Sequence, residues 1–319
     1  MYPLRVWAFL GLLAAPLQTA HAVVTLPPTV PSPDSLLDLH VEAGSGAFGD
    51  GRRDVFDFPD GTHTVAELSQ VITKDAKLAG DVNLCPTCPQ PQPIVAYSGA
   101  ATARVDFPHG KFGVIASGSV NVVPPPFVIV GDSTTTSRAL ISYHDVLRFN
   151  TADDATATTI TLTIALDGHV ARSDGGSEAD FVFISTFSEL SASGVVFPPL
   201  RALEYANQDK GVGPQESVVA RSWIRNGNSF STVLTLNGPD PYVAVFGSIG
   251  AFARGGLADY SSTAAFGIQT PPGVTFDSLS GAFLAPVPEP LTSVMMLSGL
   301  AVLALALRRK HSRALPIAG

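Results

Sequence analysis

Two acidic segments contain the oxygen ligands that a calcium ion prefers. The first holds Asp50, Asp54, Asp57 and Asp60, at spacings of four, three and three residues and followed by a glycine. The second holds Asp174, Glu178 and Asp180. Calcium takes six to eight oxygens, and its commonest loop places acidic side chains two residues apart before a glycine turn and a distal glutamate. The wider spacing here is typical of solvated turn carboxylates. We therefore expect no cofactor, and calcium at Asp54, Asp57 and Asp60 is the alternative.

The two cysteines, Cys85 and Cys88, are separated by a proline and a threonine. In an oxidising exported setting this spacing predicts a local disulfide, although the proline restricts its geometry. A zinc site needs a second Cys or His pair at suitable spacing, and none follows. A thioredoxin-like motif opens a helix, whereas this segment leads into alternating prolines and glutamines. A disulfide is thus favoured over free thiols and over a metal or redox function.

The chain lacks the common sequence motifs of catalysis. It has no Gly-x-Ser-x-Gly elbow for a nucleophilic serine, no His-Glu-x-x-His pair for a metalloprotease, and no phosphate-binding or dinucleotide loop. The histidines are scattered singly, and His144 and Asp145, as neighbours on an expected strand, point to opposite faces. Glycosidases use two carboxylates, and sequence spacing does not identify such a pair. We expect a protein without enzymatic activity, with an exported hydrolase as an alternative.

Composition favours an exported β protein. The chain has a net charge of −8, only 14% charged residues, 29 glycines and 26 prolines. Such a composition is typical of extracellular β-sheet proteins with many turns rather than of helical enzymes. No patch of Lys and Arg precedes Arg308, so the phosphate contacts that nucleic-acid binding needs are missing. Nucleic acid is therefore not expected as a partner.

The C-terminal segment 286–313 has three parts in a fixed order. It opens with the motif Pro288, Glu289 and Pro290, which an uncharged apolar run over 291–307 follows. At about 1.5 Å per residue this run makes a helix of roughly 25 Å, near the lower limit for a transmembrane helix. Clustered cations stay on the cytoplasmic side of a membrane, so the residues before 291 are expected on the far side. The cations of this basic tail are Arg308, Arg309, Lys310 and Arg313.

This tripartite tail resembles the PEP-CTERM sorting signal of Gram-negative bacteria, in which a Pro-Glu-Pro motif, a short transmembrane helix and an Arg-rich end occur together. The resemblance implies recognition by an exosortase-like processing enzyme and removal of the tail near the motif. It also implies passage through the inner membrane, where the helix holds the chain before processing. The expected destination is the cell surface or an exopolysaccharide matrix. Such a signal is an address and leaves the role of the exported part open.

The N-terminus predicts export independently. Arg5 precedes an apolar run, and Ala20-His21-Ala22 has the small-x-small form of a signal peptidase site. A cleaved signal peptide over 1–22 is therefore expected, and an uncleaved anchor is the alternative that the short run disfavours.

Residues 23–93 are expected to form an N-terminal leader before a main domain at 94–285. Prolines near the start of this leader predict an extended conformation. Thr64 to Glu67 fits a helix capping box, and apolar residues then recur at helical spacing, which predicts one short surface helix up to about Ala79. The segment 81–93, with its cysteines and prolines, marks the expected boundary.

From Ile94 onward the pattern predicts about ten antiparallel strands, hence a mainly β fold of the β-sandwich or jelly-roll type. The segments 139–149, 181–187, 218–224 and 242–254 are among the expected strands. Apolar residues between 160 and 166 alternate with threonines, which predicts a strand buried on one face. Asp167-Gly168 and Asn226-Gly227 each predict a hairpin turn.

Aromatic residues offer two interpretations. Trp223, with Tyr205, Tyr242 and Tyr260, is either part of the core or a platform on which sugar rings stack, and core burial is favoured. The sequence therefore predicts a non-catalytic exported surface or extracellular-matrix protein. A carbohydrate-binding module for exopolysaccharide and an exported hydrolase are the alternatives.

Overall fold

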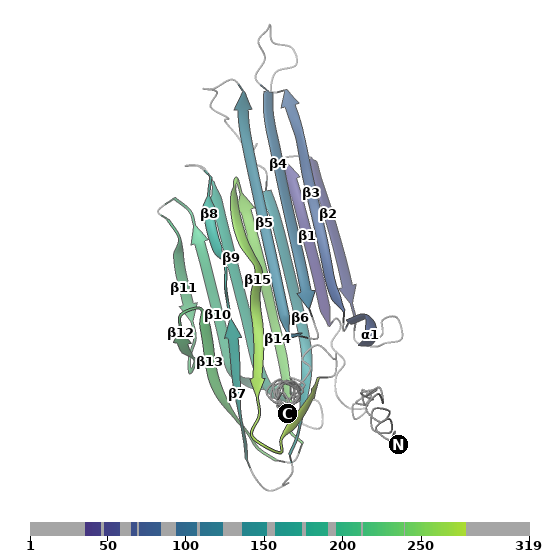
Figure 1. Cartoon of the computed structure of the whole chain (residues 1–319), viewed down its shortest axis with the longest axis vertical. Coiled ribbons are helices and arrows are strands. Elements are labelled where there is room, and N and C mark those ends of the chain that lie inside the picture. Colours follow the sequence, from purple (N-terminus) through teal and green to yellow (C-terminus); the bar gives the residue numbers. More distant parts are fainter. Residues whose placement is uncertain are drawn as a thin grey trace, which may run out of the picture.

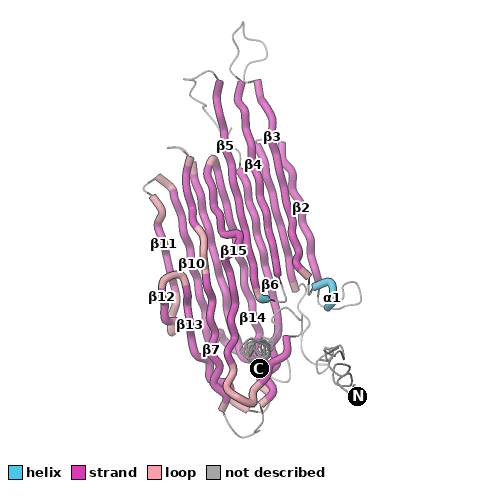
Figure 2. The backbone as a smooth tube through the Cα atoms, viewed as in Figure 1, coloured by secondary structure: helices cyan, strands magenta, loops and turns pink. Residues whose placement is uncertain are grey.

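The computed structural model describes residues 36–45, 48–57, 65–68, 70–83, 94–106, 109–123, 136–151, 157–173, 177–190, 196–211, 213–238 and 240–278. These residues are mainly β and form two antiparallel sheets, whose strands run along the long axis of the molecule (Figure 1). Figure 2 shows that strands make up most of the described backbone.

Sheet A contains eight of the described strands and is centred on β14 and β6. Its order is β11 (Gln215–Val219), β10 (Val196–Asp209), β9 (Glu178–Leu190), β14 (Tyr242–Arg254), β6 (Thr136–Asn150), β1 (Leu37–Ser45) and β2 (Phe48–Phe56). A short last strand, β16 (Thr275–Ser278), pairs with the end of β6.

Sheet B also contains eight of the described strands. Its order is β12 (Ile224–Asn226), β13 (Ser229–Leu236), β7 (Thr158–Ala165), β15 (Gly256–Gln269), β5 (Lys111–Val123), β4 (Ile94–Asp106) and β3 (Val71–Asn83). The strand β8 (His169–Arg172) pairs with the first part of β15, and β7 pairs with the last part of the same strand. At one end of the molecule β3, β4 and β5 extend beyond the strands of sheet A (Figure 1).

The inward sides of the two sheets share one apolar core. In β7, Ile160, Leu162 and Ile164 are buried while the threonines between them are more exposed, which confirms the strand predicted from this alternation. Aromatic rings meet between the sheets: Phe112 of β5 stacks on Tyr143 of β6 with ring centroids 4.7 Å apart. The strands predicted at 139–149 and 181–187 are likewise confirmed by β6 and β9.

Polar contacts join the sheets along both long edges. At one edge the backbone N–H of Lys77 in β3 donates to Asp50 Oδ2 of β2 at 3.3 Å. At the other, Arg201 Nη2 of β10 donates to the carbonyl oxygen of Val233 in β13 at 2.7 Å. Unpaired groups at sheet edges invite pairing with other chains, and contacts of this kind reduce that tendency.

A bulge in β15 interrupts the centre of sheet B. The register with β5 shifts between Tyr260 and Ala264, so residues 261–263 lie opposite Gly113 alone. A Cβ at Gly113 would lie 2.6 Å from the carbonyl carbon of Ser261. The bulge therefore needs a glycine on the neighbouring strand.

The hairpin predicted at Asp167-Gly168 is wrong. Both β7 and β8 pair antiparallel with β15, so they run in the same direction on either side of this dipeptide. Gly168 serves a different purpose, because a Cβ there would lie 2.5 Å from the ring of Tyr260. The glycine lets this ring lie across the backbone, and a distant contact of this kind leaves no local sequence signal.

The surface helix predicted up to about Ala79 is wrong beyond its first turn. The helix α1 spans only Val65–Leu68, and β3 begins three residues later at Val71. Exposure in β3 alternates every second residue: Ile72 and Ala76 are turned inward, while Val71 and its alternate neighbours are exposed. Pairing with β4 along the whole strand supplies the backbone hydrogen bonds, and this tertiary pairing overrides the helical spacing of the side chains.

The strands β1, β2 and β3 lie within the predicted leader 23–93 and belong to the two sheets, β1 and β2 to sheet A and β3 to sheet B. β1 pairs with β6, and β3 pairs with β4. The predicted boundary between 23–93 and 94–285 falls between β3 and β4 in the sequence, and these two strands pair with each other. The strands before and after that boundary therefore share one core.

The hairpin predicted at Asn226-Gly227 is confirmed, because β12 and β13 pair with Asn226 opposite Ser229. The single strand expected before it is divided, however, since β11 belongs to sheet A and β12 to sheet B. The chain crosses between the sheets at a turn in which Ser222 has a φ of 65°. Trp223 follows this turn and is 8% exposed, which confirms its expected burial in the core.

Candidate functional site

All the residues that the sequence marks for sorting lie outside the described residues. The same holds for the signal peptide over 1–22 and for the apolar run 291–307. In the part of the chain that the structure describes, no helix is long and apolar enough to cross a membrane. The named residues outside this part are Asp60, Cys85, Cys88, Pro288, Glu289, Pro290, Arg308, Arg309, Lys310 and Arg313.

The strand β16 fixes the end of the body from which the sorting segment continues. Ser278 Oγ donates to Asp145 Oδ2 at 2.6 Å, and Asn150 Nδ2 donates to Asp277 Oδ2 at 2.9 Å. Both contacts join β16 to β6, a central strand of sheet A. In the sequence, the sorting segment begins at residue 286, eight residues after the end of β16.

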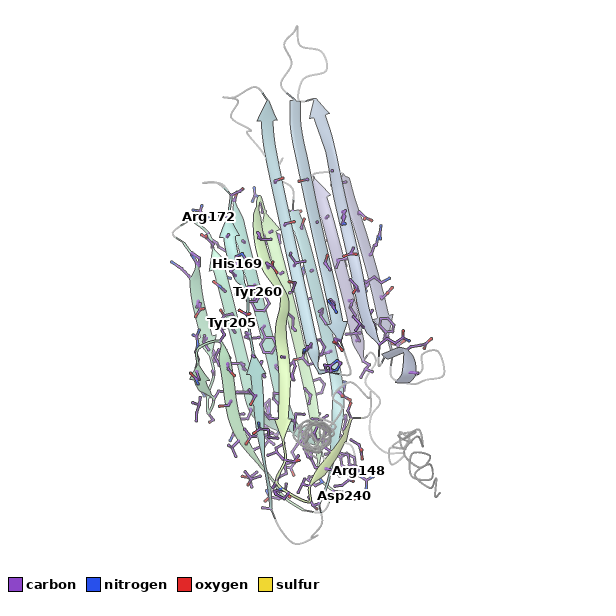
Figure 3. All side chains as sticks on the ribbon, in the orientation of Figure 1. Arg148, His169, Arg172, Tyr205, Asp240 and Tyr260 are labelled. Carbon is purple, nitrogen blue, oxygen red and sulfur yellow. The ribbon has the colours of Figure 1, made fainter. Side chains whose placement is uncertain are left out.

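An ion pair strengthens the same end of the body. Arg148 Nη2 of β6 donates to Asp240 Oδ2 at 2.6 Å, and Figure 3 shows both side chains at the end opposite the extended strands β3 to β5. The hydrogen bond to Asp240 is the largest of the effects that raise the pKa of Arg148. Arg148 thus ties the loop before β14 to the strand that holds β16.

The calcium candidates are not gathered into a site by the described residues. Asp54 Oδ2 lies 2.5 Å from Lys74 Nζ, so this carboxylate already has a cationic partner. Asp57 is half-buried just after β2. Among the residues that the structure describes, no three His, Cys, Asp or Glu side chains lie together in a way that would hold a metal ion. Calcium at Asp54, Asp57 and Asp60 remains a hypothesis for binding calorimetry.

A hydrogen-bonded network of tyrosine, asparagine, glutamate and arginine connects the sheets beside the short edge strands. Asn207 Nδ2 of β10 donates to Tyr260 Oη of β15 at 2.7 Å. Tyr205 Oη, on the same strand as Asn207, donates to Glu216 Oε1 of β11 at 3.0 Å. Arg225 Nη2 of β12 donates to the other oxygen of Glu216 at 2.7 Å. Figure 3 shows Tyr205 and Tyr260 near each other between the sheets.

The protonation states of this network suit a structural role. Burial raises the pKa of Tyr205 and of Tyr260, so both phenols stay neutral at ordinary pH. The hydrogen bond from Arg225 lowers the pKa of Glu216, which therefore stays ionised. A phenol that stays protonated is a poor nucleophile and a poor base. The network is thus suited to joining β10, β11, β12 and β15 across the two sheets.

Sequence reasoning identified the two tyrosines only as aromatic residues and missed Asn207 and Glu216. One signal was available in the sequence, because the polar residues Tyr205, Asn207 and Asp209 occur at every second position. In the structure they lie on one strand and all three are buried. Polar side chains that share the inward face of a strand need hydrogen-bond partners from the facing sheet. That requirement predicts a cross-sheet network, although not the identity of its members.

His144 stacks on Phe246 on the outer side of sheet A. The ring centroids lie 4.0 Å apart and the ring planes are nearly parallel, at 14°. Partial burial lowers the pKa of His144 from 6.5 to about 4. The imidazole is therefore neutral near pH 7, as a ring stacked on an apolar face should be.

The free energy of unfolding should fall as pH decreases from about 6.5 to about 4, partly because of His144. In this window the unfolded chain binds a proton at His144 that the folded chain does not bind, so acid favours unfolding. The shift corresponds to at most about 3 kcal/mol, and solvent screening of the partly exposed ring reduces this to about 2 kcal/mol. Replacing His144 by Phe keeps an aromatic stack and removes the titration. Urea unfolding at several pH values should show a shallower acid dependence for His144→Phe, and an unchanged dependence would contradict this assignment.

Comparison with known proteins identifies one segment of the chain. A family model described as the PEP-CTERM protein-sorting motif matches residues 286–310, as the sequence resemblance predicted. No curated protein and no solved structure matches the chain. The motif indicates an exported protein that is sorted toward the cell surface, and motifs of this kind are processed by exosortase-type enzymes.

Proposed function

Because the chain carries this sorting motif, we propose that it is a non-catalytic surface or extracellular-matrix protein whose folded part is a β-sandwich. An exosortase-like enzyme recognises Pro288, Glu289 and Pro290 while the helix at 291–307 holds the chain in the inner membrane. Processing near this motif then releases the sandwich to the cell surface or to the matrix. The observation that carries the proposal is the match of residues 286–310 to the sorting motif.

The described body supports a structural role. Its two sheets bury one aromatic core, in which Phe181 and Tyr260 stack with ring centroids 3.5 Å apart. Buried aromatic pairs contribute about 1 kcal/mol beyond their buried area. The contacts between Lys77 and Asp50 and between Arg201 and Val233 fasten the sheets at both edges. A body built in this way suits a component that must stay folded outside the cell.

Surface labelling of intact cells tests the exported location. Lys77 and Lys111 are exposed on β3 and β5, so an amine-reactive biotin reagent that does not cross membranes should label the protein on intact cells. A cytoplasmic protein measured in the same sample is the control and should stay unlabelled. Labelling that occurs only after the cells are lysed would contradict the proposal.

The alternative of exopolysaccharide binding through an aromatic strip gains no support from the aromatic residues that suggested it. Of the four, Trp223, Tyr205 and Tyr260 are each less than 9% exposed, so their faces are not available to sugar rings. Tyr242 is half-buried at the start of β14, and one such ring does not make a strip. In the proposal, exopolysaccharide is a component of the surroundings and not a ligand of these residues.

A further inference from the structure

The outward side of sheet A carries apolar side chains on its three middle strands, β9, β14 and β6. We call this surface the central face. Val182 and Ile184 of β9 are each 38% exposed. On β14, Phe246 and Phe252 also point outward and are half-buried. Neighbouring apolar groups on an outward sheet face are not needed for the core and indicate an interaction surface.

The strand register makes the central face symmetric about β14. Gly250 of β14 lies between Val182 of β9 and Leu140 of β6, two apolar side chains. A rotation that exchanges β9 with β6 would therefore bring Val182 onto Leu140. No other pair of strands of sheet A flanks β14, because β9 and β6 are its two hydrogen-bonded neighbours.

The next row of the central face carries opposite charges in the same arrangement. Phe252 of β14 lies between Asp180 of β9 and Arg138 of β6. Asp180 Oδ2 lies 3.2 Å from Nζ of Lys210, which directly follows the neighbouring strand β10. Arg138 is exposed. The same rotation would bring Asp180 onto Arg138, so this row of the face is complementary in charge to the same row of a second copy.

We propose that the central face binds the central face of a second copy of this chain, about a two-fold axis that lies along β14. A two-fold interface brings the same patch of both subunits together, so each residue of β14 meets its own counterpart. Val182 then packs on Leu140 of the second copy, and Asp180 pairs with Arg138 of the second copy. Two facing sheets of this kind pack about 10 Å apart.

The size of the central face fits a small specific interface. The strands β9 and β6 both pair with β14 along its whole length, Tyr242–Arg254. With about 4.8 Å between strands and about 3.4 Å per residue, the three strands cover about 600 Å². Two such faces bury about 1,200 Å² in total, the lower end of the range for specific protein interfaces. This inference uses only the folded body and does not depend on the sorting proposal.

Cross-linking at Ser248 tests the proposed axis, because this residue lies on β14 between Phe246 and Gly250. The purified full chain, in mild detergent, would carry Ser248→Cys in a background of Cys85→Ser and Cys88→Ser. A short bis-maleimide should join two copies, since facing sheets leave only a few ångströms between the two sulfur atoms. The matched control is Thr161→Cys, a half-buried outward position on sheet B, which should give no dimer.

A second variant separates a specific interface from accidental association. Val182→Arg, added to Ser248→Cys, should reduce the cross-linked fraction at least about tenfold, because a charge at the centre of an apolar interface is desolvated. Thermal unfolding of this variant should be unchanged, since Val182 is exposed. Three outcomes would overturn the proposal. The first is no cross-linked dimer for Ser248→Cys, and the second is an equal cross-linked fraction for Thr161→Cys. The third is that the thiol of Ser248→Cys reacts freely with maleimide and becomes protected only when matrix polysaccharide is added.

Discussion

Replacing Gly113 with alanine is expected to lower the free energy of unfolding by about 3 kcal/mol or more, because it inserts a methyl group where the β15 bulge packs. The new Cβ would lie 2.6 Å from the carbonyl carbon of Ser261 and would overlap its oxygen. The obstacle is backbone, so a rotamer change cannot relieve it. The bulge would have to move, and with it the pairing of β15 with β5. Thermal unfolding of the purified chain measures this effect as a lower midpoint, by about 6 °C or more.

Gly267→Ala is the matched control for this prediction. Gly267 lies on the same strand, β15, and a Cβ there would make an ordinary contact, 3.5 Å from Thr163 Cβ. The substitution should leave the unfolding midpoint close to that of the unmodified chain, or raise it slightly by restricting the unfolded state. Equal midpoints for Gly113→Ala and Gly267→Ala would show that the bulge does not depend on Gly113.

Replacing Pro288, Glu289 and Pro290 together with alanine is expected to abolish processing and surface delivery. These residues lie within the matched motif at 286–310. In our proposal the sorting enzyme recognises these three residues, and alanines at all three positions remove the carboxylate of Glu289 and the backbone constraint of the two prolines. The chain should keep its C-terminal tail and should be depleted from the surface, as it would be in a strain that lacks the sorting enzyme.

The folded body provides the control for the motif variant. Pro271→Ala with Pro272→Ala changes the same residue type at the turn before β16, outside the motif. This control should be processed and delivered normally. The motif variant should show an unchanged unfolding midpoint, because 286–310 lies beyond the strands that form the two sheets. Normal delivery of the motif variant would contradict the assigned role of these residues.

Local periodicity was sufficient to predict several strands. The alternation at Ile160, Leu162 and Ile164 identified β7 because one face of this strand is buried and the other is not. The strand expected at 242–254 corresponds to β14 residue for residue. In such segments the burial pattern is a property of neighbouring residues, so the sequence contains it directly.

The failed predictions concern features that depend on distant residues. Val71 to Asn83 became a strand because β4 pairs with it, and the apolar spacing at its start fitted a helix equally well. Gly168 is explained by the Tyr260 ring and not by a turn. The division between β11 and β12 likewise depends on which sheet each segment joins. A single sequence gives no signal for these contacts.

The sorting site was predictable for the opposite reason. Its residues act as a contiguous segment, so Pro288, Glu289 and Pro290 could be recognised without a fold. The network of Tyr205, Asn207 and Glu216 instead joins strands that are neighbours only in the folded chain. The central face of sheet A depends in the same way on the register of three strands.

The mature termini and the cellular fraction of the exported product test the account most directly. Mass spectrometry of the protein made in a host that has the sorting enzyme should find an N-terminus at Val23 and a C-terminus near Pro288-Glu289-Pro290. The product should be recovered from the cell surface or the medium. An intact C-terminus, with the protein retained in the inner membrane, would contradict the account and would leave a membrane-anchored β domain.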